Sequence, residues 1–207
     1  MIYSANMLKT YKACPKKYEY KYIEHFSFPT RFEIFEKGKK IHALACYYLR
    51  KNDITEFEKA LSNEEIELWN RLKNNPYFNL NVLASEYELN CKIGNFWIGG
   101  RLDAVVFDDE NNYYILDYKT GSIPLKPNDD MQTLVYLKAL DSYLDGNYKS
   151  LKFVYIDLKN NCNEIINYNA QKSVDIENLL TQMHLDIYPQ TSDKKNCEIC
   201  EYRHICV

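Results

Sequence analysis

Two short stretches of the sequence carry residue types that could hold a metal ion beside a reactive water. A G-x-x-D sequence runs from Gly100 to Asp103, and a D-x-K sequence follows from Asp117 to Lys119. Both read as β-strands, and the polar run 108–112 between them predicts a turn. Because side chains alternate along a strand, Asp117 and Lys119 share one side, and a hairpin partner brings Asp103 beside them. Two carboxylates and one amine are therefore expected to converge.

This combination suits a divalent metal ion, a water molecule and a phosphodiester. Mg²⁺ and Mn²⁺ prefer oxygen ligands, typically one or two carboxylates with water and substrate phosphate. The metal lowers the pKa of a bound water and offsets charge on the phosphate. A nearby lysine can orient or deprotonate the water, or hold the phosphate. A D-x-K tripeptide alone is also typical of a solvated strand end, so the interpretation depends on further residues.

Three more polar residues have the spacing of site residues. His42 lies near the start of a predicted helix, beside apolar neighbours that would face a core. Gln132 and Tyr136 are four apart, which places both on one face of a predicted helix. Taken alone, the histidine is typical of a hydrogen-bonded core residue, and the polar pair is typical of an amphipathic helix.

In chain order, the histidine, the two acidic motifs and the Q-x-x-x-Y pair resemble the motif series of the RecB-like branch of the PD-(D/E)XK nucleases. In that family the histidine and both acidic residues ligate metal, the lysine is catalytic, and the glutamine and tyrosine lie near the active site and the DNA. Carried over, these residues are His42, Asp103, Asp117, Lys119, Gln132 and Tyr136. The backbone carbonyl of Tyr118 is a further candidate ligand. No core motif position is substituted, which argues against a decayed pseudo-enzyme.

An acidic residue on the preceding predicted strand is a weaker candidate. Some relatives have an acidic residue near the position of Glu86 that touches the metal or its water. Glu86 and Glu88 share a strand face, so either could approach the site. A solvated strand face explains the pair equally well.

The cysteines predict a second metal site. The chain has seven, an odd number, and no secretory signal, which argues against a disulfide framework. Cys197, Cys200 and Cys206 form a C-x2-C-x5-C tail that needs a fourth ligand, and Cys14, just before Pro15, is the candidate. This spacing alone also suits zinc. The other thiols, Cys46, Cys91 and Cys162, are expected to be ordinary core or surface residues.

The cysteine pattern resembles that of the iron–sulfur nucleases, which include the Cas-four-like CRISPR-associated exonucleases and the AddB nuclease domain. The resemblance implies a [4Fe–4S] cluster, rather than zinc, held by Cys14, Cys197, Cys200 and Cys206. A cluster shared between the two chain ends would fasten them together and make its assembly part of folding.

Length and composition predict one domain. The chain has 207 residues, of which 46% are hydrophobic, and it has no run of eighteen apolar residues, so a cytoplasmic protein without a membrane span is expected. The net charge of −3 leaves any DNA binding to local patches. Two lysine runs are visible, one beside His42 and one near Cys14: Lys37, Lys39 and Lys40, and Lys12, Lys16, Lys17 and Lys21. Each is also typical of a solvated helix surface.

The predicted elements form an α/β plan with helices first and a mixed sheet after them. Ser4 is expected to cap the first helix. Helices are predicted at about 5–12, 15–25, 31–50, 53–73, 130–143 and 174–184, and strands at about 82–93, 96–107, 113–119, 150–158 and 164–169. With the resemblance, these predict a restriction-endonuclease-like mixed β-sheet flanked by helices. Within one domain, 1–80 would be a mostly helical N-terminal region, 81–170 the catalytic sheet core and 171–207 a helix and the cluster-binding tail.

The expected function is a Mg²⁺- or Mn²⁺-dependent DNA nuclease. The resemblance implies an exonuclease or end-processing enzyme that acts on single-stranded DNA, in CRISPR adaptation or in recombination and repair, together with a protein partner. Two alternatives stay open. One is a non-catalytic or partner-dependent subunit that binds DNA ends, and the other is a zinc-stabilised protein whose nuclease motifs are coincidental.

Overall fold

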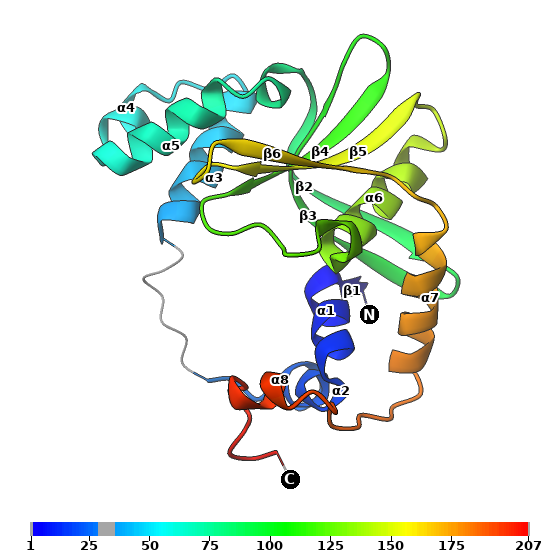
Figure 1. Ribbon diagram of the computed structural model, residues 1–207. Helices are drawn as coiled ribbons and strands as arrows, with labels where there is room; N and C mark the ends of the chain where they lie inside the picture. The colour runs from blue at the N-terminus through cyan, green and yellow to red at the C-terminus, as the bar shows by residue number, and fades with distance from the viewer. Residues whose placement is uncertain (1, 29–35, 207) are drawn as a thin grey trace.

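A computed structural model describes residues 2–28 and 36–206, and within these residues six strands form one mixed sheet (Figure 1). The order is β1-β3-β4-β5-β6, and β2 pairs with the other edge of β3. Strand β1 is parallel to β3 and β4 is parallel to β5, whereas the other pairs are antiparallel. The strands are β1 (Ile2–Ser4), β2 (Asn81–Ile93), β3 (Phe96–Phe107), β4 (Asn112–Lys119), β5 (Ser150–Asp157) and β6 (Cys162–Asn167).

Helices cover both faces of the sheet and bury a separate apolar core on each (Figure 1). One face, the α6 face, carries α1, α6 and α7, and the other, the α3 face, carries α3 and α5. Alternate strand residues serve the two cores: Ile115 packs toward α6, while Leu116 packs toward α3. The helices are α1 (Ala5–Ala13), α2 (Pro15–Tyr18), α3 (Glu36–Leu49), α4 (Thr55–Lys59), α5 (Asn63–Lys73), α6 (Met131–Leu144), α7 (Lys172–Met183) and α8 (Lys194–Glu198).

The alternation of side chains breaks in the middle of β3. Ile98 and Leu102 pack in the core of the α6 face, but Ala104 packs in the core of the α3 face, although all three are even-numbered. On the neighbouring strand, Glu86 has a φ of +48° and is passed over in the ladder. Both strands are therefore irregular where Glu86 and Asp103 lie opposite each other, which turns these two side chains away from a regular strand face.

Most predicted elements are confirmed, and the exceptions have local causes. Ser4 caps α1, because its hydroxyl accepts a hydrogen bond from the Met7 backbone. The single helix predicted at 53–73 is wrong: Ser62 starts a new helix there, and it exchanges reciprocal capping hydrogen bonds with Glu65. The helix predicted at 15–25 continues from α2 as a π-helical turn (Glu19–Ile23).

Other differences lie at the ends of elements. Residues 31–35 of the helix predicted at 31–50 lie outside the described residues. The short elements β1 and α8 were not predicted. None of the helices in the described part of the chain is both long and apolar enough to cross a membrane.

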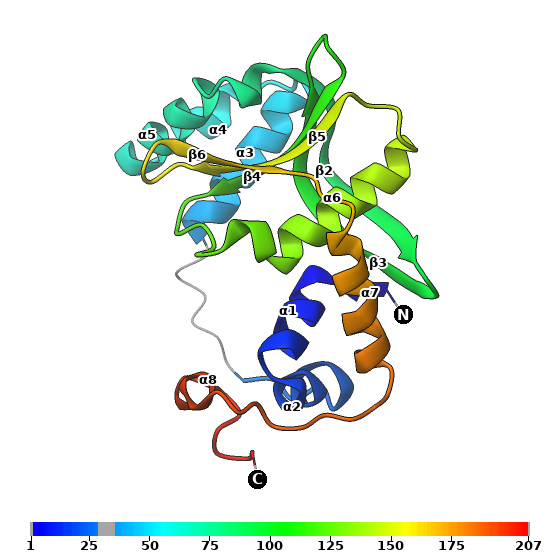
Figure 2. The same cartoon turned by 45° about the vertical axis from the view of Figure 1, so that its right-hand side comes forward.

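The segment around α2 and the C-terminal tail lie side by side, with α8 close to α2 in both views (Figures 1 and 2). The Tyr202 hydroxyl donates to the Phe26 carbonyl at 2.8 Å, and the Tyr20 hydroxyl donates to the Ile205 carbonyl at 3.2 Å. The rings of Tyr20 and Tyr202 lie 5.5 Å apart between their centres. Hydrogen bonds and ring contacts therefore join the cysteine tail to the N-terminal segment.

Candidate active site

The candidate site lies at a fork in the sheet. On one edge of β3, β1 pairs as far as Gly99 and β4 pairs only from Ala104 onward. Asp103 and Asp117 are the first residues beyond the paired stretch, one on each strand. Both acidic residues therefore lie at the point where the two strands separate.

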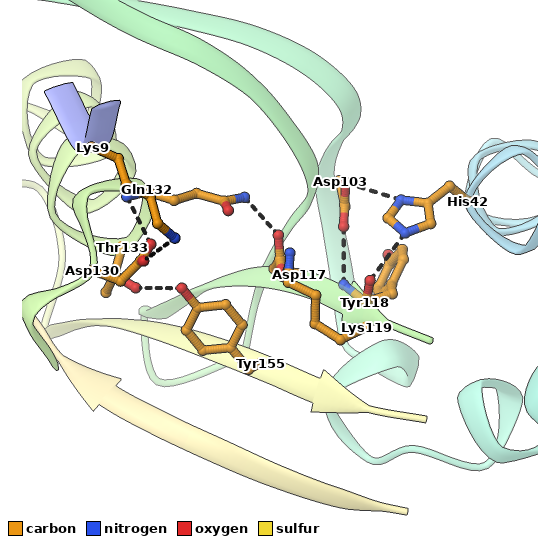
Figure 3. A network of polar contacts seen from close by, with 10 residues as sticks. All are labelled: Lys9, His42, Asp103, Asp117, Tyr118, Lys119, Asp130, Gln132, Thr133 and Tyr155. Atoms are coloured by element: carbon orange, nitrogen blue, oxygen red, sulfur yellow. Dashed lines mark hydrogen bonds and ion pairs between the residues drawn. The ribbon is translucent and has the colours of Figure 1, made fainter. Parts of the chain in front are cut away.

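Asp103 is held from two directions (Figure 3). The backbone N–H of Tyr118 donates to its Oδ2 at 2.9 Å, and Nδ1 of His42 lies 3.1 Å from its Oδ1. The other ring nitrogen of His42 lies 3.0 Å from the Tyr118 carbonyl oxygen. Because both partners are acceptors, this geometry favours a doubly protonated ring. Burial lowers the pKa of His42, but the hydrogen bond and charge of Asp103 outweigh it, and the net shift is upward.

Asp117 faces α6 (Figure 3). The side-chain amide of Gln132 donates to its Oδ1 at 2.7 Å, and Nζ of Lys119 lies 2.7 Å from its Oδ2. That Oδ2 is buried and accepts no aligned hydrogen bond. Burial and the nearby charge of Asp103 raise the pKa of Asp117 to about 6, although Lys119 acts in the opposite direction. Burial and the charge of Asp103 therefore disfavour the ionised form of Asp117 despite its contact with Lys119.

The irregular backbone of β2 at Glu86 places its side chain near His42 and Asp103. One ligand atom from each of His42, Glu86 and Asp103 lies within 4.8 Å of the other two. The guanidinium Nε of Arg101 lies 2.5 Å from Oε2 of Glu86. Glu88, the other candidate on this strand, is exposed and belongs to no such group among the described residues.

Gly100 of the G-x-x-D motif leaves room for the ring of Tyr136 from the Q-x-x-x-Y motif. A β-carbon on Gly100 would lie 2.7 Å from Cε1 and 2.8 Å from the hydroxyl oxygen of Tyr136. Only a residue without a side chain lets the ring pack this close to β3. Burial, followed by the charges of Asp117 and Asp103, raises the pKa of the Tyr136 hydroxyl to about 12, so the group stays neutral.

A groove of about 970 Å³ between α3, β2 and the end of β4 is lined by four of the site residues, His42, Glu86, Asp103 and Lys119. Its acidic lining residues are Glu86 and Asp103, and its basic lining residues are Lys39, Arg50, Arg101 and Lys119. Arg50 binds Ser85, with its guanidinium 3.2 Å from the hydroxyl and 2.9 Å from the carbonyl oxygen. The groove, called here the active-site groove, thus presents an acidic centre with a basic rim.

A profile of the PD-(D/E)XK nuclease superfamily matches residues 58–207, which is most of the chain. The chain belongs to the PD-(D/E)XK nuclease superfamily. The matched range includes both acidic motifs and the Q-x-x-x-Y pair, whereas His42 lies before it.

One solved structure agrees with this assignment at the level of the fold. The chain is similar to a provisionally named exonuclease from Eubacterium rectale, with a TM-score of 0.58 and 11% identity over 100% of this chain and 88% of the other. It also matches the structure of SSO0001, with a TM-score of 0.47 and 18% identity over 99% of this chain and 85% of the other. No match was found among the curated proteins that were compared.

PD-(D/E)XK nucleases typically use divalent metals, and the residues at this nuclease site fit such an ion. The triad of His42, Glu86 and Asp103 offers one nitrogen and two carboxylate oxygens at ligand spacing. The buried Oδ2 of Asp117, which lies 2.7 Å from Nζ of Lys119, provides a further carboxylate oxygen nearby. Because His42 is now bound to two acceptors, it must lose a proton and release one of them to become a ligand.

All four candidate cluster cysteines line one cavity of about 290 Å³. Cys14 caps α2, with its sulfur 3.4 Å from the Lys17 backbone nitrogen. Burial, and then the nearby Cys14, Cys200 and Cys197, raise the pKa of the Cys206 thiol. The long-range convergence of Cys14 with the tail is therefore present in the fold.

The structure places the sequence candidates at two separate centres. The nuclease motif residues gather at the fork, and the four cysteines gather between the chain ends. Of the metal candidates, His42 and Asp103 lie in the triad, Asp117 lies beside it, and the Tyr118 carbonyl faces His42. Sequence reasoning missed Arg50 and Arg101, since neither has a distinctive spacing.

Proposed function

We propose that this protein is a Mg²⁺- or Mn²⁺-dependent deoxyribonuclease that acts on single-stranded DNA or on DNA ends. The supporting observation is the fork between β3 and β4, where Lys119 lies beside two carboxylates and a triad of ligand spacing. The proposed metal ligands are His42, Asp103 and Asp117, with Glu86 added by the geometry. The backbone carbonyl of Tyr118 is proposed as a further ligand.

The roles of the side chains follow from their contacts. A bound Mg²⁺ or Mn²⁺ lowers the pKa of a water and offsets charge on the phosphate. Lys119 holds the attacking water with its ammonium group or takes a proton from it. Gln132 fixes Asp117 by donating to Oδ1, which leaves Oδ2 facing Lys119. Water oxygen bonds to phosphorus, the P–O bond to the leaving strand breaks, and the leaving oxygen takes up a proton.

The test is cleavage of end-labelled linear and closed-circular single-stranded DNA by anaerobically purified protein, with Mn²⁺ and with chelator. Metal-dependent loss of the linear strand alone indicates an exonuclease, and loss of both indicates an endonuclease. Lys119→Ala should slow cleavage by about 100-fold or more. Lys92→Ala, an exposed lysine that lines neither centre, is the matched control. Full activity of Lys119→Ala would refute the assignment, and binding without cleavage would favour a partner-dependent DNA-end-binding subunit.

We also propose that Cys14, Cys197, Cys200 and Cys206 bind a [4Fe–4S] cluster. The support for this proposal is that the four cysteines line one cavity, together with the resemblance of their pattern to that of the iron–sulfur nucleases. Roles in CRISPR adaptation or in recombination and repair, with a protein partner, are proposed from the cysteine pattern.

A further inference from the structure

A second groove, of about 870 Å³, lies beside the candidate active site on the α6 face. It is bounded by α1, by the loop that joins β4 to α6, and by α7. Four lysines from these three segments line it, and the name lysine groove is used for it below. They are Lys9, Lys12, Lys126 and Lys172.

One loop separates the two grooves. Gly121 and Ser122 line the active-site groove, and Pro124 to Lys126 line the lysine groove. Two extended residues span no more than about 7 Å, so the grooves lie on either side of a single crest. Figure 3 shows a second link: Lys9 contacts Asp130 at 2.9 Å, and Asp130 caps the helix whose Gln132 binds Asp117.

Part of the positive charge in the lysine groove is already neutralised. Lys9 pairs with Asp130, and Lys172 pairs with Asp129 at 2.8 Å. Lys12 and Lys126 form no ion pair with any residue in the described ranges, and both contribute, after Lys172, to lowering the pKa of Asp129. Asp175 also lines the groove, so its four lysines exceed its three aspartates by one charge, and the amines of Lys12 and Lys126 remain for an external anion.

The crest carries an apolar side chain in solvent. Leu125 is fully exposed and lies between Pro124 and Lys126, with Pro127 next in the chain. Pro124 and Pro127 each fix their own φ, which narrows the conformations open to the loop that carries this side chain. An exposed leucine between the basic rim of the active-site groove and the lysine groove fits the face of a nucleobase, whose phosphates lie on either side.

We propose that the DNA strand crosses the loop 121–127 from the active-site groove into the lysine groove. Lys12 and Lys126 contact its phosphates there, and Leu125 packs against a base at the crest. This proposal rests on the proposed function and extends it, because it assigns the path of the substrate next to the scissile bond. It also requires that substrates long enough to cross the loop gain affinity over shorter ones.

The test compares single strands of about 4 to about 16 nucleotides. For the double variant Lys12→Glu/Lys126→Glu, we expect kcat/KM on long strands to fall roughly tenfold through KM, with strands too short to cross the loop unaffected. The slope of log binding constant against log salt concentration should become shallower by about 1.4, the value expected for the loss of two phosphate contacts. The control is Lys92→Glu/Lys159→Glu, which makes the same charge change at exposed lysines outside both grooves.

A loss that is equal at every length, or equal in the control variant, would overturn the proposal. The neutral variant Lys12→Gln/Lys126→Gln should show a smaller loss of the same kind, which excludes misfolding caused by reversed charge. If the wild-type protein bound strands but cleaved none, the nuclease assignment would fail, while the length dependence of binding would still decide the path.

A second measurement addresses Leu125. Leu125→Ser should weaken binding of long strands, and an abasic site at the nucleotide that reaches the crest should abolish the difference from the wild-type protein. If no abasic position did so, Leu125 would not contact a base.

Discussion

Replacement of Gly100 by alanine is expected to destabilise the protein and disturb the candidate active site. The new β-carbon would lie 2.7 Å from Cε1 of Tyr136, whereas carbons in favourable contact lie about 3.5–4.0 Å apart. The ring or the strand must therefore move by roughly 1 Å. The φ of Gly100 lies outside the left-handed region, so the penalty comes from packing and not from backbone strain.

The position of Tyr136 on α6 links the expected loss of stability to a loss of cleavage. Tyr136 lies one turn after Gln132 on α6, and Gln132 donates to Asp117 at 2.7 Å. Overpacking of this kind costs about 1–3 kcal/mol of unfolding free energy. A shift of α6 also lengthens the bond between Gln132 and Asp117, so cleavage should fall together with stability.

The assay is urea unfolding of Gly100→Ala, Tyr136→Ala and the double variant, with cleavage rates measured alongside. Because Tyr136→Ala removes the clash, the double variant should be more stable than the sum of the single changes by about 1–3 kcal/mol. Gly121→Ala is the matched control, since a β-carbon there meets nothing within 4 Å. Its stability should change by less than about 0.5 kcal/mol. Additive single effects, or a wild-type stability of Gly100→Ala, would refute the packing argument.

Three further outcomes are expected. Because the pKa of Asp117 is raised in the folded state, the free energy of unfolding in chelator should fall as the pH rises from about 4 through about 6. Asp117→Asn should remove that fall, raise the free energy of unfolding by up to about 3 kcal/mol near neutral pH, and abolish cleavage. A pH profile of stability identical to that of the wild type would contradict this. Arg101 neutralises Glu86, so Arg101→Ala should bind Mn²⁺ more tightly by calorimetry without DNA, and weaker binding would count against a shared carboxylate. Cys200→Ser should lose the visible absorbance of the purified protein while Cys162→Ser, an exposed thiol outside the cavity, should keep it; equal spectra would exclude the proposed cluster.

The sequence predicted most elements because their periodicity and caps are local. The strand ends at Phe96–Phe107 were predicted as found, and Ser4 and Pro15 mark the starts of α1 and α2. The same rules failed at Ser62, where a capping box inside an otherwise helical pattern starts a second helix. The convergence of Asp117 with Lys119 followed from strand alternation, and their contact at 2.7 Å confirms it.

By itself, the sequence determined the order of the nuclease motifs and the two strands that carry the acidic residues. It also identified Cys14 and the three tail cysteines as candidate ligands of one site. Each of these depends on residue type and spacing. Tertiary structure decided that the Glu86 side chain reaches His42 and Asp103, because an irregularity in β2 and β3 interrupts the regular alternation of side chains there. It also decided that Gly100 must lack a side chain and that the lysines of three segments share one groove. Such features depend on contacts between residues far apart in the chain, which local patterns do not encode.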